Sequence, residues 1–402
     1  MSSTSGSIDS RPRQRANGAG VVITGGGLSG QRCAETLRRC GFEGPIRIVC
    51  AETHRPYDRP PLSKAVLAGG SDHAALHYRP QEWYGHHDIE LLLGMPARGL
   101  RPADRRLVLS DGRELRYDKL LIATGGRPRM LPILGSFENV SVLRTLGDAL
   151  ALRAELGTGR RLAVVGAGLI GLEIAASARG LGTDVTLIEA GECPVQAVLG
   201  THFGGWLARL HRDEGVRVLT GVTVTEAIGN GRLSGLLCSD GTRVAVDHVV
   251  VGVGIQPDTS WLADSGLDAA AGVPVDVDGA TALDGVFAAG DAAAALDPLL
   301  RRHVPGSHWE AAARQGTRAA RAMLGLEQSS LPPSSFWTDQ YGLRIHYVGD
   351  RRLADAVQID GEPDNRDFTA TFTHAGRAVA ALLVNRPRSL PAAREQIQRG
   401  SR

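Results

Sequence analysis

Three closely spaced glycines and a distant acid are the first residues in this chain whose types and spacing suggest chemistry. Gly25, Gly27 and Gly30 follow the pattern G-x-G-x-x-G, and Glu52 lies about 20 residues further on. The first glycine permits a tight turn, the second lets backbone approach a pyrophosphate, and the third lets a helix pack closely on a strand. A carboxylate at this distance accepts hydrogen bonds from a ribose 2′-hydroxyl. The pattern predicts a dinucleotide site, with a purely structural glycine turn as the alternative.

The same pattern occurs a second time, in residues 161–190. Gly166, Gly168 and Gly171 take the three glycine positions, and Glu189 ends the strand-like run that follows. An acid at that place repels the 2′-phosphate of NADP, and no arginine follows it closely, so we expect NADH to be preferred over NADPH. Two such units predict two dinucleotides side by side, most simply one bound FAD and one exchangeable NADH.

Lysine and cysteine are the remaining side chains that could take part in a reaction. Lys64 ends the segment RPYDRPPLSK, residues 55–64, and is one of only two lysines among 45 basic residues. A surface lysine is the alternative to a functional one. The chain has no C-x-x-C pair and no His/Cys spacing typical of a metal site, so we predict no metal and expect buried or free thiols in a reducing compartment. The five cysteines are Cys33, Cys40, Cys50, Cys193 and Cys238.

Strand-like and helical runs are placed to hold these loops. A β-branched run at residues 21–23 leads into the first glycine loop, a helical stretch follows it, and a second strand at residues 46–50 ends close to Glu52. Two apolar runs that end in glycine turns, residues 120–128 and 249–257, are typical of crossovers out of and back into a first nucleotide domain.

A further strand-like run, residues 285–293, ends in Gly-Asp, and we expect a helix to begin there. Asp291 is then placed to accept a ribityl hydroxyl of FAD while the helix N-terminus faces phosphate. A plain helix N-cap is the alternative for this residue.

Length and composition limit the class of protein. The 402 residues predict two or three domains, and 43% hydrophobic residues are ordinary for a globular protein. A net charge of +2 gives no reason to expect nucleic acid, and no apolar run approaches the roughly 18 residues of a membrane span. Residues 1–20 lack the apolar core of a secretory signal, so we expect a disordered extension and a cytoplasmic protein.

Taken together, these segments resemble the pyridine-nucleotide flavin reductases of the glutathione-reductase-like fold. The narrower resemblance is to the NADH-dependent, FAD-containing ferredoxin reductases of the putidaredoxin reductase-like family. It rests on RPYDRPPLSK, on HWE at residues 308–310, on FWTDQYGLRIHYVG at residues 336–349 and on VNRP at residues 384–387, and it covers about residues 21–388. The implied fold is α/β, with two Rossmann-like dinucleotide-binding domains and a small α+β C-terminal domain.

The resemblance implies the following domain boundaries. A discontinuous FAD domain is expected at residues 21–127 and 254–326, an inserted NADH domain at residues 128–253, and a C-terminal interface domain at residues 327–402.

The resemblance also implies roles for a lysine and a glutamate. The family's lysine matching Lys64 lies beside the flavin ring and pairs with the glutamate matching Glu173. An ammonium there stabilises the negative charge of the reduced flavin, and an arginine is too long and planar to replace it. Disulfide reductases of this fold carry reactive cysteines near the flavin, whereas this chain has none between Ala51 and Lys119, so thiol chemistry is not expected.

Two tryptophans are implied to lie at the flavin. Backbone amides around Trp309 are expected to bind the pyrimidine edge of the ring at a helix N-terminus, and Trp337 is expected at the ring edge that faces the electron acceptor. An ordinary core tryptophan is the alternative for each. The remaining implied cofactor contacts are Arg59, Ala123, Thr124 and Gly125.

The implied activity is that of an NADH:ferredoxin oxidoreductase, in which FAD takes a hydride from NADH and passes single electrons to a 2Fe-2S ferredoxin of a monooxygenase or ring-hydroxylating dioxygenase. One alternative is a rubredoxin-type or general NADH diaphorase reductase, which shares these motifs. Another is an NADH-binding redox sensor resembling apoptosis-inducing factor, against which the small net charge and the lack of a long C-terminal insertion argue.

Ferredoxins are acidic, so the docking face is expected to be locally basic in a chain of small net charge. A charged face that is merely solvated is the alternative. We expect a monomer or weak dimer. The docking candidates are Arg301, Arg302 and His303 before Trp309, with Arg314 and Arg318 after it.

Overall fold

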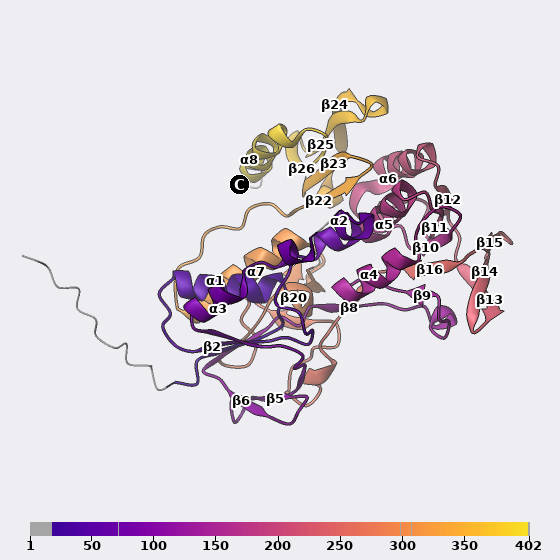
Figure 1. Ribbon diagram of the computed structural model, residues 1–402. Coiled ribbons are helices and arrows are strands. Elements are labelled where there is room, and N and C mark those ends of the chain that lie inside the picture. The colour runs from indigo at the N-terminus through magenta and orange to yellow at the C-terminus, as the bar shows by residue number, and fades with distance from the viewer. Residues whose placement is uncertain (1–17, 71, 298, 307, 401–402) are drawn as a thin grey trace, which may run out of the picture.

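The computed structural model describes residues 18–70, 72–297, 299–306 and 308–400. Most of the expected N-terminal extension, residues 1–17, lies outside the described residues. Figure 1 shows three groups of elements: an indigo and orange group around α1 and α7, a magenta group around α5 and α6, and a yellow group above both. The expected α/β fold is confirmed, whereas the exact domain boundaries stay a prediction.

The first nucleotide-binding unit is built on a parallel five-stranded sheet. Helices α1 (Leu28–Arg39) and α7 (Trp309–Met323) pack side by side on one face, although they are far apart in sequence. The other face is covered by the small antiparallel sheet of β4 (Ala97–Arg101), β5 (Arg106–Leu109) and β6 (Glu114–Arg116) and by β18 (Val273–Val275). The strands of the parallel sheet are, in spatial order, β19 (Val286–Ala288), β7 (Lys119–Ile122), β1 (Val21–Thr24), β2 (Ile46–Val49) and β3 (Ile89–Leu92).

The second unit repeats this plan with a second parallel sheet. Helices α5 (Leu169–Gly180) and α6 (Gln196–Asp213) cover one face. The antiparallel strands β13 (Val224–Asn230), β14 (Arg232–Cys238) and β15 (Arg243–Ala245) lie against the other. Its strands, in spatial order, are β12 (Arg217–Thr220), β11 (Asp184–Glu189), β10 (Arg161–Val165), β16 (His248–Val251) and β9 (Val140–Ser141).

Both sequence crossovers lie together in a short two-stranded ribbon. Strand β8 (Gly126–Pro128), which leaves the first unit, pairs antiparallel with β17 (Ile255–Pro257), which returns to it. After β17 the polypeptide forms β19, a 3-10 turn at Gly290–Ala292 and the hairpin of β20 (Ala293–Asp297) and β21 (Arg302–Pro305) before α7 begins. The second unit is therefore an insertion in the first.

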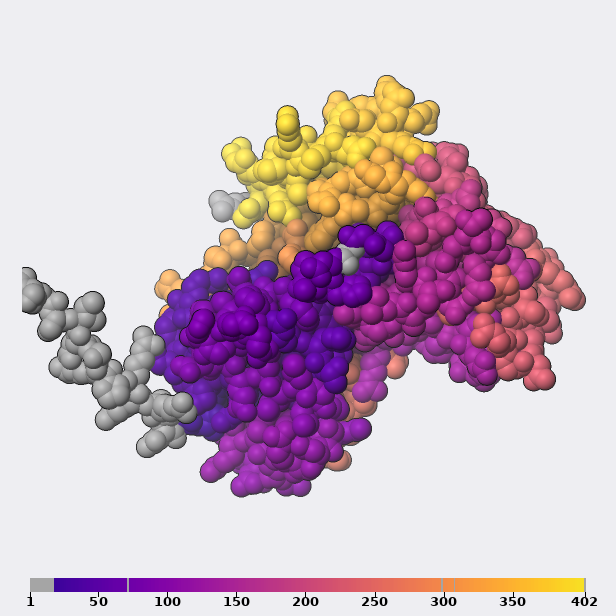
Figure 2. Space-filling model, viewed as in Figure 1, coloured from indigo at the N-terminus to yellow at the C-terminus, as the bar shows by residue number. Residues whose placement is uncertain are grey.

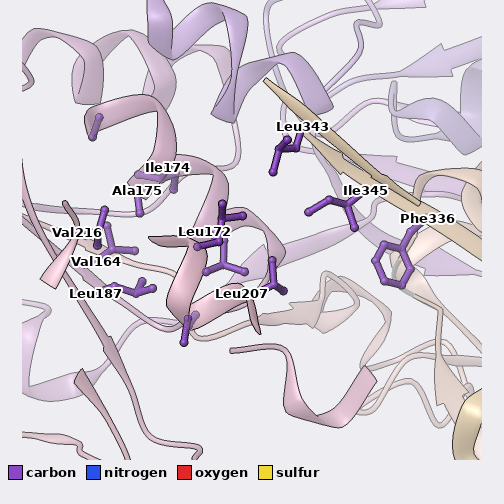
Figure 3. Close-up of a cluster of buried hydrophobic side chains, with 14 of the residues drawn as sticks. Val164, Leu172, Ile174, Ala175, Leu187, Leu207, Val216, Phe336, Leu343 and Ile345 are labelled. Carbon is purple, nitrogen blue, oxygen red and sulfur yellow. The ribbon is translucent and has the colours of Figure 1, made fainter. Parts of the chain in front are cut away.

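The C-terminal part is an antiparallel five-stranded sheet with one helix, α8 (Leu390–Gly400), packed on its outer face. Its inner face packs on α5 and α6 in one continuous apolar core, in which Leu343 and Ile345 lie close to Leu172 of α5 (Figure 3). Burying each such side chain contributes roughly 1.5–3 kcal/mol. In spatial order the strands are β22 (Ser335–Gln340), β23 (Leu343–Gly349), β26 (Arg377–Val384), β25 (Asp367–His374) and β24 (Ala356–Glu362).

Aromatic packing fixes the far end of this sheet on α6. The ring of Phe368 stacks on Phe203, with the ring centroids 5.9 Å apart, and meets Trp206 edge-on, with the centroids 5.3 Å apart. The indole nitrogen of Trp206 donates to the carbonyl of Pro363 at 3.1 Å. As a result the yellow C-terminal group lies over the junction of the two nucleotide-binding units (Figure 2). None of the helices in the described ranges is long and apolar enough to cross a membrane.

Candidate active site

One large cavity lies where the three parts of the chain meet. Its empty volume is about 1200 Å³, counted to its open mouth. Residues from the first glycine loop, from residues 59–64, from α5, from the start of α7 and from β22 all line it. These stretches are far apart in sequence, and they meet at one site together with further residues described below.

The first glycine loop has the geometry that its sequence predicts. Gly25 has φ of +117°, and a Cβ atom there would lie 2.0 Å from the carbonyl oxygen of Ala123. A Cβ on Gly30 would lie 2.1 Å from the carbonyl oxygen of Gly25, whereas one on Gly27 would meet nothing within 4 Å. Gly27 is also the N-cap of α1 and leaves the helix end without a side-chain cap. The open backbone at a helix N-terminus fits the pyrophosphate of a dinucleotide.

The second loop repeats these distances. A Cβ on Gly166, which has φ of +105°, would lie 2.5 Å from the carbonyl oxygen of Gly252. A Cβ on Gly171 would lie 2.1 Å from the carbonyl oxygen of Gly166, and one on Gly168 would again meet nothing within 4 Å. This loop also fits a dinucleotide, but its glycines do not line the cavity.

The two strand-end acids have partners in the protein, and neither lines the cavity. The carboxylate of Glu52 accepts from the hydroxyl of Tyr57 at 2.6 Å and from the guanidinium of Arg59 at 2.7 Å. The carboxylate of Glu189 accepts from the backbone amides of Ala167 at 2.6 Å and of Gly191 at 2.7 Å. Their predicted ribose contacts stay a prediction.

Lys64 and Glu173 come together as the resemblance implies. Lys64 follows a proline-led 3-10 turn (Pro60–Ser63), and its Nζ lies 2.8 Å from Oε2 of Glu173 on α5. Both side chains line the cavity, and the glutamate is buried. The hydroxyl of Ser63 donates to the same Oε2 at 2.5 Å, and that of Thr338 donates to Oε1 at 2.7 Å. Sequence reasoning missed Ser63 and Thr338, whose local patterns carry no signal for this contact.

Both expected tryptophans line the cavity in mutual contact. Trp309, the first residue of α7, and Trp337 of β22 meet edge to face at 5.4 Å. The indole nitrogen of Trp309 donates to Asp58 at 2.7 Å, an acid in the same proline-rich segment as Lys64. Phe336 also lines the cavity and stacks on His308 at 4.9 Å. The short aromatic motifs therefore lie beside the Lys64 segment.

Asp291 lies on the cavity wall, but the helix expected to begin there is absent. A single 3-10 turn at Gly290–Ala292 is followed at once by β20, and the next helix begins only at Trp309. Consequently Asp291 is not the N-cap of an α-helix. Its carboxylate pairs at 2.8 Å with Arg144, a cavity residue that sequence reasoning missed. The run of small residues after Asp291 continues as an extended strand because it pairs with β18 and β21.

The turn that follows β7 reaches the cavity at two of its three predicted contacts. Ala123 and Gly125 line it, and Gly125 has φ of +76°. Thr124 does not line it, and its hydroxyl instead donates to the carbonyl of Asp258 at 2.6 Å. Arg59 also lines the cavity, where it donates to the carbonyl of Arg144 at 2.5 Å.

Thiols take no part in this cavity. No cysteine is found among the described residues that line it. Burial raises the pKa of Cys33, and burial together with nearby Glu52 raises the pKa of Cys50 to about 12, so both remain protonated. Cys50 lies under the first glycine loop, where its sulfur would be 2.5 Å from a Cβ on Gly26. In the same described ranges, no group of three or more His, Cys, Asp or Glu side chains could hold a metal ion.

The five docking candidates are not equally accessible. Arg301, Arg302 and His303 are exposed at the tip of the β20–β21 hairpin. In contrast, Arg318 is largely buried and binds Asp278 at 2.5 Å and the carbonyl of Ser329 at 2.8 Å, so it is not available as a docking cation. Its helix position gave no sign of this because the partners come from distant loops.

Arg314 is also unsuited to docking. It is partly buried, and its guanidinium lies 3.6 Å from Glu310 on the same helix. Burial lowers the pKa of Arg314, and the neighbouring carboxylate opposes that effect. Glu310 also pairs with Arg394 at 2.7 Å, so the two arginines share one carboxylate.

Comparisons with other proteins agree with this geometry. Residues 19–316 match the family model of pyridine nucleotide-disulphide oxidoreductases, and residues 335–402 match the reductase C-terminal model. The chain is 34% identical to putidaredoxin reductase of Pseudomonas putida over 374 residues, covering 91% of this chain and 89% of the relative. It is 37% identical over 384 residues to the ferredoxin–NAD(+) reductase component of an anthranilate 1,2-dioxygenase system of Burkholderia cepacia, with 94% of each chain covered.

The fold also matches solved structures. Putidaredoxin reductase in its covalent complex with putidaredoxin superposes with a TM-score of 0.91 at 34% identity, covering 95% of this chain and 93% of that chain. A ferredoxin reductase for the CYP199A2 system of Rhodopseudomonas palustris superposes with a TM-score of 0.87 at 33% identity, covering 91% of each chain. Two of these four relatives are named as ferredoxin reductases, one of them for a dioxygenase system, and the other two as putidaredoxin reductase.

Proposed function

The chain belongs to the pyridine nucleotide-disulphide oxidoreductase family, and on that premise we propose that it is an NADH-dependent, FAD-containing ferredoxin reductase. Its electron acceptor is then a 2Fe-2S ferredoxin that serves an oxygenase, as in the relatives named above. Family members with this domain pair work with FAD and NAD(H).

One observation carries the proposal: the cavity is lined by a lysine–glutamate pair and, among its described residues, by no cysteine. Lys64 and Glu173 line the cavity 2.8 Å apart, and no cysteine is among the described lining residues. A disulphide reductase requires a thiolate that attacks or releases sulfur. Without one, electrons have no protein acceptor at this cavity and must leave to an external partner.

The residues that line the cavity would hold and orient FAD. Gly27 would let the pyrophosphate approach the N-terminus of α1, and Asp291 with Arg144 offers polar contacts to the ribityl chain. FAD, when bound, accepts a hydride from NADH and releases electrons singly. The ammonium of Lys64 is a fixed positive charge available to the negative charge of the reduced ring.

The remaining cavity residues orient the reacting groups and shield them from water. Glu173 holds the ammonium of Lys64 in place and offers a carboxylate to the nicotinamide amide. The backbone amides at the start of α7, around Trp309, face the cavity with the positive end of the helix dipole. The rings of Trp309 and Trp337 cover the cavity wall and limit the access of water.

NADH is the expected donor because no positively charged side chain among the described residues pairs with Glu189. Its partners are backbone amides, which donate hydrogen bonds but carry no formal charge. A 2′-phosphate brought close to this carboxylate is repelled, and no arginine follows within the next three residues to offset the repulsion.

The exposed hairpin cations offer a docking face for an acidic ferredoxin. Arg302→Glu is expected to lower the rate of ferredoxin reduction about tenfold at low salt and to leave ferricyanide reduction unchanged, because long-range charge acts on the encounter between the two proteins. Arg318→Glu is not a suitable control, since it breaks the ion pair with Asp278. Arg388→Glu reverses an exposed charge elsewhere and serves instead. Equal losses with ferredoxin and ferricyanide would contradict docking at the hairpin.

The function itself is tested by reconstitution. The purified protein should carry FAD, lose its yellow absorbance on addition of NADH, and reduce cytochrome c only when a 2Fe-2S ferredoxin is present. Cytochrome reduction at full rate without ferredoxin would support a general diaphorase. Preference for rubredoxin in the same assay would support a rubredoxin reductase, and a slow stoichiometric complex with NADH would support a redox sensor.

A further inference from the structure

The carboxylate of Glu173 is the point at which all three parts of the chain converge. Its Oε2 accepts from Lys64 at 2.8 Å and from Ser63 at 2.5 Å, both in the segment after the first glycine unit. Its Oε1 accepts from the hydroxyl of Thr338 in the C-terminal sheet at 2.7 Å. Glu173 itself belongs to α5 of the second unit and is only 5% exposed. A buried carboxylate depends on such donors because water does not solvate it.

The hydroxyl of Thr338, which donates to Oε1, is the last member of a longer chain of hydrogen bonds. The amide nitrogen of Gln340 donates to the hydroxyl oxygen of Thr338 at 3.0 Å. Nε2 of His211, on α6, lies 2.8 Å from the amide oxygen of Gln340. The hydroxyl of Tyr341 lies 2.8 Å from Nδ1 of the same imidazole. Thr338, Gln340 and His211 are 1%, 2% and 0% exposed, so the chain is dry along its length.

The groups in this chain admit one consistent direction. Because Glu173 only accepts, Thr338 must donate to it and therefore accepts from the amide of Gln340. The amide oxygen of Gln340 then faces His211, which must donate through Nε2. Nδ1 of His211 is left to accept the hydroxyl of Tyr341. Burial lowers the pKa of His211 to about 4, so its ring is neutral at neutral pH and carries the single proton that this order requires.

We propose that Thr338, Gln340 and His211 are positioning residues that hold the Glu173 carboxylate against Lys64 through a one-way chain of hydrogen-bond donors. The proposal rests on the proposed function, because it assigns these residues to the orientation of Glu173 and Lys64 during hydride transfer. Successive donors polarise one another, so each link strengthens the bond at the carboxylate. The chain also fixes β22, which carries Trp337, on the helices of the second unit.

The first test needs no turnover. In the FAD-bound protein labelled with 15N-histidine, the resonances lost in a His211→Asn variant identify His211. At pH 7 we expect a neutral ring protonated on Nε2 and hydrogen-bonded at both nitrogens. Thr338→Val should shift the Nε2 signal, because it removes the hydroxyl that accepts from Gln340, the hydrogen-bond partner of His211. A ring protonated on Nδ1, or a signal insensitive to Thr338→Val, would overturn the proposed direction.

The second test is kinetic. Thr338→Val should lower the limiting rate of flavin reduction at saturating NADH about tenfold, because a bond to the charged carboxylate is lost. Thr338→Ser, which keeps the hydroxyl, should stay within about twofold of the unchanged protein. Gln340→Met and His211→Phe should have progressively smaller effects, in the order of their distance from Glu173.

A matched control separates positioning from general loosening of the C-terminal sheet. Thr371→Val removes a hydroxyl from β25 of the same sheet, where the described residues provide it with no hydrogen bond, and should leave the rate unchanged. A purely structural role predicts equal losses in Thr338→Val and Thr338→Ser, or losses that follow melting temperature and not chain position. Either result would contradict the proposal.

The outcomes distinguish this inference from the proposed function. If NADH fails to reduce the FAD of the unchanged protein, the proposed function is wrong, while the imidazole spectrum still tests the chain. If the unchanged protein reduces ferredoxin and Thr338→Val does so at the same limiting rate, the function stands and the positioning role is wrong.

Discussion

The two glycine loops have nearly the same backbone geometry, but their strand-end acids are bound in different ways. A Cβ on Gly30 or on Gly171 would lie 2.1 Å from the carbonyl oxygen of the loop's first glycine. Glu52, however, is bound by side chains, one of them the cation of Arg59. Among the described residues, Glu189 is bound only by backbone amides of its own loop and of the turn after it.

This difference has an electrostatic consequence. Arg59 offsets the charge of Glu52, while no cation in the described part of the chain forms an ion pair with Glu189. The first unit is thus closed by side chains from neighbouring segments, which suits a cofactor that stays bound. The second depends on its own backbone, which suits a coenzyme that exchanges and is selected by charge.

Lys64 and Glu173 join the two units, and breaking their pair should have the largest effect. Lys64→Met leaves the buried carboxylate of Glu173 without its cation and should lower the free energy of unfolding by about 3–5 kcal/mol. Urea denaturation of the FAD-bound protein measures the change. The double variant Lys64→Met/Glu173→Gln should recover most of the loss.

The other lysine of the chain is the matched control. Lys119 has no ion pair in the described part of the chain, and Lys119→Met should change the free energy of unfolding by less than about 0.5 kcal/mol. Similar losses for both lysines would mean that the pair does not stabilise the junction.

Acid should weaken the second unit more than the first. The pKa of His211 is lowered from 6.5 to about 4 by burial, so the unfolded chain binds a proton in this range that the folded protein does not. The free energy of unfolding therefore has its full value above about pH 6.5. It decreases as the pH falls toward 4, and His211 accounts for at most about 3 kcal/mol of this decrease. The groups facing the ring are Gln340, Tyr341 and Glu214, the last paired with Arg366.

Hydrogen exchange resolves this effect by region. Between pH 6.5 and 4.5, amides of α6 should lose protection faster than amides of α1, whose packing against α7 contains no buried imidazole. In His211→Gln the difference between the helices should shrink. An unchanged difference would show that other groups cause the acid sensitivity.

Matched glycine substitutions should separate the two coenzymes. In Gly30→Ala and Gly171→Ala the new methyl group would meet a backbone oxygen at 2.1 Å, a strain of roughly 1–3 kcal/mol. Gly30→Ala should weaken FAD binding, measured as flavin content, whereas Gly171→Ala should keep FAD and weaken NADH binding by roughly 10- to 100-fold. Gly180→Ala, at the end of the same helix as Gly171, meets nothing within 4 Å and should be neutral.

Coenzyme choice should show the smallest effect. Glu189→Gln removes the uncompensated charge and should reduce the preference for NADH over NADPH about tenfold, roughly 1.4 kcal/mol, in kcat/KM. Glu52→Gln should leave the preference unchanged, because its charge is already offset and belongs to the other unit. An equal change in both variants would contradict the assignment of the units.

Much of this site could be predicted from short stretches of sequence. Each glycine triplet predicts its own loop, because backbone conformation and close packing within one strand–turn–helix unit are local properties. The same holds for the strands that lead into the loops. The pairing of Lys64 with Glu173 came from resemblance to a family, since the two residues lie in different units and neither alone indicates the other.

Local patterns did not reveal contacts made between distant segments. Arg318 looked like an exposed cation on a helix, yet Asp278 and a loop carbonyl bury it. A helix was expected to begin at Asp291, yet strand pairing extends the chain after it and Arg144 binds its carboxylate. In both cases the partner is remote in sequence, so no local rule describes it.

The sequence by itself predicted two dinucleotide loops, an acid in the second that favours NADH, and a segment from Ala51 to Lys119 without cysteine. Only the tertiary structure decided that Ser63, Lys64 and Thr338 meet on one carboxylate, with His211 behind them. Loop conformation depends on residues a few positions apart, whereas a buried carboxylate takes its donors from whichever segments packing brings to it.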